Sequence, residues 1–235
     1  MGNPSTGFNG GAAGTVTVAG ANVPAPAIAL ATTDAVALAT TYHNHSPAYD
    51  SYSVDLTVSP NLKIVAKATV VSGNGTSPPV DLGPQICTNC GAALRGNVLA
   101  TVTPAVGDDY VLAVTTDDGT SCNLTAKVTG VITGWAAKTA PASNATGVSL
   151  TPDFTWTAPS PAPTGAYSYQ LIVWPATGGN SVWTLDVPSG TTTVHYNSDG
   201  HATALVSGTQ YLWTVRVSDA FGNQSDEGSG QFTTL

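Results

Sequence analysis

The sequence predicts an all-β protein built from two β-sandwich domains in tandem. Its 235 residues include 25 Gly and 16 Pro but only six Lys and Arg and a single glutamate, so several residue types that favour helices are scarce. Thr, Val, Tyr and Trp, which favour strands, recur in short runs of alternating apolar and polar side chains. Gly, Pro, Asn and Asp interrupt these runs at regular intervals, which is typical of the turns of a sandwich.

A change in composition predicts the domain boundary. The segment "KTAPASNATG" is rich in Pro, Ala, Ser and Asn and interrupts the alternating pattern. We therefore expect a Gly-rich tether over residues 1–13, an N-terminal β-sandwich over 14–137, a linker over 138–146 and a second domain over 147–235. The first residues of the sequence, "MGNPSTGFNGGAAG", are typical of a tether that follows a removed targeting peptide.

In the N-terminal half, strands are expected wherever alternation runs between two breaks. "YSVDLTV" shows it clearly, and "YVLAVTTDDGTSCNLTAKV" predicts a hairpin in which Asp118-Gly119 occupies a turn that requires positive φ. The expected strands cover residues 14–19, 27–31, 35–42, 51–58, 62–71, 80–86, 97–103, 109–116 and 123–133.

The C-terminal half contains seven alternating runs in fewer than 100 residues, which predicts a Greek-key sandwich. The runs cover residues 147–150, 153–158, 166–174, 181–187, 191–196, 209–218 and 229–234. In "YLWTVRV" the alternation directs Tyr211, Trp213 and Val215 toward the core.

Residues 141–235 resemble a bacterial fibronectin type III domain. The family's second-strand Trp is matched by Trp156 in "DFTWTAP", and its third-strand Tyr by Tyr169. Its Leu-x-x-Gly-Thr-x-Tyr signature is matched in "LVSGTQYLWTV" by Leu205, Gly208, Thr209 and Tyr211, with Ser207 in place of the usual proline. The resemblance implies that the hydroxyl of Tyr211 bonds to the backbone upstream. It also implies that "SDAFGNQS" is a loop, the one that carries recognition motifs in adhesive family members.

The expected core of this second domain combines the family's positions with the alternation. It comprises Trp156, Tyr169, Leu205, Tyr211, Trp213 and Val215. The same alternation directs Ile172, Trp174 and Leu212 outward, and Trp183 in "NSVWTLDV" is expected on the adjoining strand. These four residues are the candidates for an aromatic binding face, unless the first domain or the long insertion covers them. Such a face suits contact with another protein, or with a sugar if the two Trp rings are coplanar and exposed.

The histidines and cysteines of the first domain allow two interpretations, a metal site or a disulfide. His43 and His45 in "YHNHS" lie two residues apart, as on one side of a strand, and with Cys87 and Cys90 in "ICTNCG" they would suit a tetrahedral Zn²⁺ ion. The favoured alternative is a disulfide among Cys87, Cys90 and Cys122, of undetermined pairing, with the histidines in a polar loop. We expect no cofactor, and no metal site is favoured.

Catalytic patterns are not evident in the sequence. It has no Gly-x-Ser-x-Gly, no Gly-rich phosphate loop and no His-Glu-x-x-His. Asp108-Asp109 and Asp117-Asp118 flank one strand pair and could gather around Ca²⁺, but roles in turns and solubility are the stronger expectation. The chain is therefore expected not to be an enzyme.

The charge balance narrows the partners. A formal net charge of −8 repels nucleic-acid phosphates, and no apolar run is long enough to span a bilayer. We expect an exported bacterial surface protein with a structural or adhesive role, whose partners are other surface proteins, copies of itself, or a glycan. In a filament, residues 14–19 would add as a strand to a neighbouring copy. A carbohydrate-binding module and a metal-binding surface protein are the alternatives.

Overall fold

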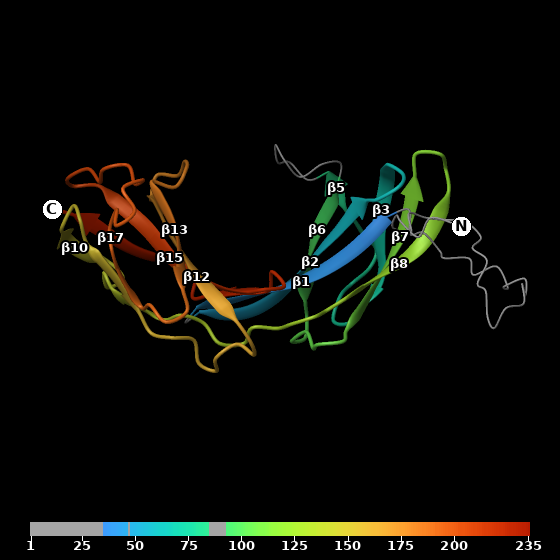
Figure 1. Ribbon diagram of the computed structural model, residues 1–235, viewed down its shortest axis with the longest axis horizontal. Coiled ribbons are helices and arrows are strands. Elements are labelled where there is room, and N and C mark those ends of the chain that lie inside the picture. Colours follow the sequence, from blue (N-terminus) through green and yellow to red (C-terminus); the bar gives the residue numbers. More distant parts are fainter. Residues whose placement is uncertain (1–34, 47, 85–92) are drawn as a thin grey trace, which may run out of the picture.

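The computed structural model describes residues 35–46, 48–84 and 93–235, and every regular element among them is a strand. The strands form two sandwiches, each around its own hydrophobic core, and one sheet contains strands of both sandwiches (Figure 1). The all-β prediction is confirmed. The tether over 1–13 and the strands expected at 14–19 and 27–31 lie outside the described residues.

The N-terminal sandwich packs two sheets face to face. One contains, in spatial order, β1 (Ala35–Ser46), β2 (Tyr49–Pro60), β6 (Leu94–Ala100) and β5 (Gly83–Pro84). The other contains β4 (Val80–Asp81), β3 (Val65–Gly73), β7 (Asp109–Thr116) and β8 (Ser121–Lys127). Alternate residues of each strand meet between the sheets, for example Val54, Leu56 and Val58 from β2 and Tyr110 and Leu112 from β7.

The β7–β8 hairpin shows why its turn sequence was informative. Gly119 has φ +83°, which a residue without Cβ adopts at little cost. The Asp118 carboxylate accepts hydrogen bonds from the Thr116 hydroxyl at 2.7 Å and the Thr120 amide at 3.0 Å, so it closes the turn. These bonds, the Thr116 bond first, hold the pKa of Asp118 below its ordinary value.

The C-terminal sandwich has a small sheet and a large one. The small sheet has the order β14 (Thr193–His195), β11 (Asp153–Trp156) and β9 (Lys138–Ala140). The large sheet contains β10 (Ala145–Val148), β17 (Gly230–Thr234), β15 (Gln210–Asp219), β12 (Tyr167–Pro175) and β13 (Trp183–Pro188). β15 lies at its centre, between β12 and β17.

The core of this sandwich is aromatic. All six residues expected in it are buried: Trp156, Tyr169, Leu205, Tyr211, Trp213 and Val215. The hydroxyl of Tyr211 accepts a hydrogen bond from the Val206 amide at 3.0 Å, the upstream backbone contact that the resemblance implies.

One short strand joins the two sandwiches by pairing with both of them. β16 (Gln224–Asp226) pairs with β15 on one side and, in parallel, with the far end of β1 on the other, so the large sheets of both domains are continuous. In Figure 1 the blue β1–β2 hairpin reaches from the N-terminal sandwich toward the C-terminal one. β1 extends beyond the expected end at residue 42 because β2 pairs with it as far as Ser46, and on its other edge β16 pairs with Tyr42, His43 and Asn44.

The segment between the domains differs from the expected linker. Ile132 and Ala136 are already buried in the second core, and β9 pairs with β11 inside the range 138–146. Composition suggested a linker there because short strands with few large apolar side chains leave little alternation to read. The residues that join the two domains are 129–137, and they run along the surface formed by the paired strands β1 and β16. We call this surface the junction.

Candidate functional site

The junction depends on one buried amide side chain. Asn223, fully buried, precedes β16, and its Oδ1 accepts hydrogen bonds from the amide of Thr41 at 2.9 Å and from the Thr41 hydroxyl at 3.2 Å. Its Nδ2 donates to Asp219 Oδ2 at 2.8 Å. Because one side chain holds the β15–β16 turn against β1, the ends of the two domains are joined by specific polar contacts as well as by strand pairing.

The joining segment is bonded to the same surface. The Thr41 hydroxyl donates to the Gly130 carbonyl at 3.0 Å, and the Ser225 hydroxyl donates to the Gly134 carbonyl at 2.7 Å. Gly134 lies so close to the loop at Pro161 that a Cβ there would be 2.0 Å from the Pro161 carbonyl oxygen. Residues 130–134 are therefore fixed to both domains.

The opposite side of the junction holds a polar cluster. The Tyr42 hydroxyl donates to Asp226 Oδ2 at 2.5 Å, the Arg216 side chain lies 3.9 Å from the same oxygen, and its guanidinium lies over the Tyr42 ring at 5.8 Å. Burial, and then the bond to Asp226, raise the pKa of Tyr42 well above its ordinary value. A neutral tyrosine and a paired carboxylate make a structural cross-link rather than an acid–base pair poised near neutral pH.

The histidines lie at the end of the β1–β2 hairpin, on a strand and not in the expected polar loop. His43 Nε2 is 2.5 Å and His45 Nδ1 is 3.3 Å from Asp50 Oδ1. Sequence reasoning placed the two imidazoles on one side of a strand but missed Asp50, which faces His45 across the hairpin in the β1–β2 register. Cys87 and Cys90, their expected co-ligands, lie outside the described residues.

Aromatic rings position both histidines. His43 is buried and stacks on Tyr52 with ring centroids 4.2 Å apart, and His45 stacks on Trp135 of the joining segment at 3.5 Å. The hydrogen bond to His43 holds the pKa of Asp50 below its ordinary value, so this carboxylate is ionised near neutral pH.

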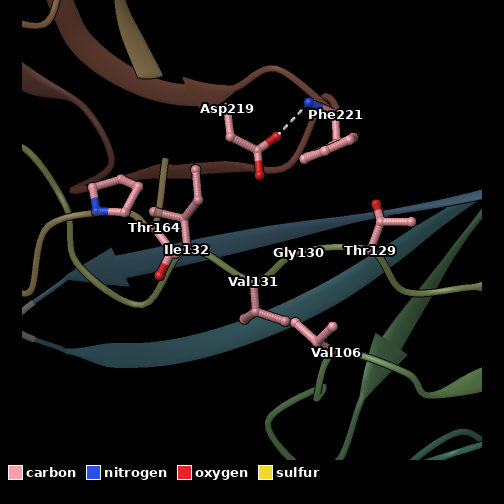
Figure 2. Close-up of a pocket in the computed structure, with 9 residues that line it drawn as sticks. Val106, Thr129, Gly130, Val131, Ile132, Thr164, Asp219 and Phe221 are labelled. Atoms are coloured by element: carbon pink, nitrogen blue, oxygen red, sulfur yellow. Dashed lines mark hydrogen bonds between the residues drawn. The ribbon is translucent and has the colours of Figure 1, made fainter. Parts of the chain in front are cut away.

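A cavity of about 330 Å³ lies beside the junction, between the joining segment and loops of both domains. Figure 2 shows the lining residues Val106, Val131 and Ile132, with Asp219 and Phe221 above them in this view. The Asp219 carboxylate bonds to the amides of Phe221 and Asn223 and to the Asn223 side chain. The acid in this cavity is thus engaged in holding its own turn.

The aromatic binding face expected on the second domain is corrected by the structure. Trp183 is buried in the core, packs against Tyr196 and donates its indole N–H to Asp199 at 2.9 Å. Trp174, Ile172 and Leu212 are only half-buried and lie on the other face of the sheet. Placing Trp183 on the strand next to Trp174 does not determine which way its side chain points. The register of β13 against β12 does, because it pairs Trp183 with the inward-facing Val173.

The structure describes only some of the other candidate residues in the first domain. Cys122 carries a free, exposed thiol on β8, while Cys87 and Cys90 lie outside the described residues. Asp108 and Asp109 lie at the start of β7, and Asp117 and Asp118 follow its end, so the two pairs do not share one ion. The part of the chain that the structure describes contains no helix long and apolar enough to cross a membrane.

Comparison with known proteins assigns the second domain. Residues 137–234, fewer than half of the chain, match the family model described as the Rha78A-like, N-terminal immunoglobulin domain. No curated protein matches the chain. Together with its topology, the match shows that this segment is an immunoglobulin/fibronectin type III-like domain, as the resemblance implied.

Solved structures also match the chain, among them two with tandem domains. The FN1–FN3 domains of chicken CNTN1 are 12% identical, with a TM-score of 0.33, and the alignment covers 78% of this chain and 61% of that one. The tandem Ig repeats of Dlar are 10% identical, with a TM-score of 0.36 and coverage of 86% and 97%. The chain thus spans less than two thirds of the CNTN1 structure.

Proposed function

We propose that the chain is a non-enzymatic structural or adhesive unit of an exported bacterial surface protein, in which two sandwiches act as one stiff body. The β1–β16 pairing, with Asn223 bonded to Thr41, is the observation that carries this proposal. Two domains on a mobile linker would present their loops at variable angles. A shared sheet keeps the loops of both domains in a fixed arrangement, which suits a spacer or a docking surface.

The chemistry of the described residues supports a role without catalysis. Immunoglobulin and fibronectin type III-like domains are generally non-enzymatic. The acids at the junction are engaged: Asp219 holds its own turn, Asp226 binds Tyr42, and Asp50 bonds to two histidines. The partners we propose are other surface proteins or further copies of the chain. Sugar binding is not favoured, because the coplanar exposed Trp pair that it requires is broken by the burial of Trp183.

Stiffness can be measured from one domain to the other. A spin label on the exposed Cys122 and a second on Ser198→Cys, with Cys87 and Cys90 replaced by serine, report an inter-domain distance by pulsed electron resonance. We expect a narrow distance distribution that broadens with Asn223→Ala. A distribution equally broad in both proteins contradicts the proposal of a stiff unit.

Location and assembly are tested on the source cells. Antibody labelling of intact cells should mark the surface, and electron microscopy of the native material should show whether the chain forms fibres. Filament assembly through residues 14–19 predicts that deleting them abolishes fibres while leaving both sandwiches folded. Labelling only after the cells are lysed contradicts the surface role.

A further inference from the structure

Three metal-ligating groups converge at the tip of the β1–β2 hairpin. His43, His45 and Asp50 each offer one donor atom, and these three atoms all lie within 4.8 Å of one another. The strand geometry produces this arrangement: His43 and His45 are two positions apart and share one face, while Asp50 pairs directly with His45 across the hairpin. The cluster therefore follows from register and not from a chance approach of loops.

The two imidazoles are held in place before any ion arrives. Stacking on Tyr52 fixes His43, and stacking on Trp135 at 18° between ring planes fixes His45. His43 is 2% exposed, so its ring has little freedom to rotate away. Ligands that are already ordered lose little conformational entropy on binding, which favours a site over an incidental cluster.

We propose that His43, His45 and Asp50 form a binding site for a divalent transition-metal ion, with Zn²⁺ the best match. Two imidazole nitrogens and one carboxylate oxygen are ligands of zinc-like ions, whereas Ca²⁺ and Mg²⁺ take oxygen ligands. The Asp50 side chain is 60% exposed, so the ion can enter from solvent and water can fill its remaining coordination position.

Two of the three distances between donor atoms fit this ion with a small adjustment. Ligand atoms around tetrahedral Zn²⁺ are about 3.3 Å apart, given metal–ligand bonds of about 2.0–2.1 Å. His45 Nδ1 and Asp50 Oδ1 are already 3.3 Å apart, while His43 Nε2 and Asp50 Oδ1, at 2.5 Å, must separate by less than about 1 Å. The exposed carboxylate can make that movement.

The surroundings of His43 set the expected strength. Coordination through Nε2 leaves the ring proton on Nδ1, and this buried atom has no hydrogen-bond partner. An acceptor at that position typically raises metal affinity by about 10–100-fold, so we expect moderate affinity. Binding should also tighten the junction, because the His45 ring stacks on Trp135 of the joining segment.

The test is a calorimetric titration of the full chain with Zn²⁺. Cys87, Cys90 and Cys122 are replaced by serine, because a Cys-x-x-Cys pair can bind zinc by itself; wild-type protein with alkylated thiols serves if that variant does not fold. We expect one equivalent of Zn²⁺ per chain, and a loss of affinity of at least about tenfold in His45→Gln and in Asp50→Asn.

The matched control is His195→Gln. His195 and Asp153 are an exposed pair 2.8 Å apart and do not belong to the cluster of His43, His45 and Asp50, so this change should leave the titration unaltered. Bound Co²⁺ gives a second readout, since its visible absorption should show nitrogen and oxygen ligands and disappear in Asp50→Asn. The proposal is overturned if the cysteine-free chain binds no stoichiometric ion, or if His45→Gln and Asp50→Asn bind as tightly as their parent.

Discussion

The side chain of Asn223 bonds to the backbone of Thr41 across 182 positions of sequence, and in doing so joins two β-sandwiches. Its single oxygen accepts from both the amide and the hydroxyl of Thr41, while its nitrogen is bonded to Asp219. A fully buried amide with its oxygen and its nitrogen both engaged is specific in a way that an apolar contact is not, because no shift of register preserves these bonds.

Removing this amide should loosen the junction. Asn223→Ala leaves the buried Thr41 amide without an acceptor, which costs about 1–3 kcal/mol per unsatisfied group. We expect a matching fall in the free energy of unfolding in urea, together with a larger radius of gyration in solution scattering. Gln170→Ala is the control, because the exposed Gln170–Asp186 bond lies within one domain. Equal changes in the free energy of unfolding and in the radius of gyration for Asn223→Ala and Gln170→Ala would contradict a specific role of Asn223 at the junction.

Gly134 should not tolerate a side chain. A Cβ there would lie 2.0 Å from the Pro161 carbonyl oxygen, a backbone atom that cannot rotate away. Gly134→Ala is expected to cost about 1–3 kcal/mol or more in the free energy of unfolding, as overpacking does. Gly190→Ala, where an added Cβ meets nothing within 4 Å, should be close to neutral. Calorimetric melting of the two variants makes the comparison.

Tyr211→Phe tests the contact between β15 and the segment before it. The change keeps the buried ring and removes the hydroxyl that accepts from the Val206 amide. A loss of about 1 kcal/mol in the free energy of unfolding is expected, the usual net value of such a bond. Tyr49→Phe, on an exposed ring, should change stability little. Identical unfolding midpoints for Tyr211→Phe and wild type would show that the bond contributes nothing.

Trp183→Ala should act on stability and not on sugar recognition. The ring is buried against Tyr196, and truncating a buried Trp typically costs about 3–5 kcal/mol. Trp174→Ala, at a half-buried position, is expected to lower the free energy of unfolding by less. Unfolding of both variants in urea measures the difference. A specific loss of glycan binding in a still-folded Trp183→Ala protein would restore the binding-face interpretation.

Acid should weaken the hairpin tip through Asp50. The His43 bond lowers the pKa of this carboxyl in the folded state, so the stabilisation is present above its unfolded pKa of about 3.9 and is lost as pH falls through the lower folded value. The stability difference between wild type and Asp50→Asn, measured without metal, should therefore shrink below about pH 4. Asp117→Asn, at an exposed position, is the control. If the difference in free energy of unfolding between wild type and Asp50→Asn does not change with pH, this account is contradicted.

Alternation identified most of the strands because the period of two is a local property of the sequence. Strand β7 covers Asp109–Thr116, as expected, and the inward residues of β15 are buried as its pattern indicates. β16 was missed for the same reason: "SDAFGNQS" has no apolar alternation, and its pairing partner is in the other domain. The candidate metal site was half visible, since His43 and His45 share a strand face, but Asp50 could be added only once the hairpin register was known.

The sequence by itself determined the fold class, the aromatic core of the second domain and the turn chemistry, because these depend on neighbours a few residues apart. Only the tertiary structure decided the course of the joining segment, the burial of Trp183 and the junction between the domains. Those features depend on which distant strands meet and in what register, and a one-residue change of register reverses the face of every side chain.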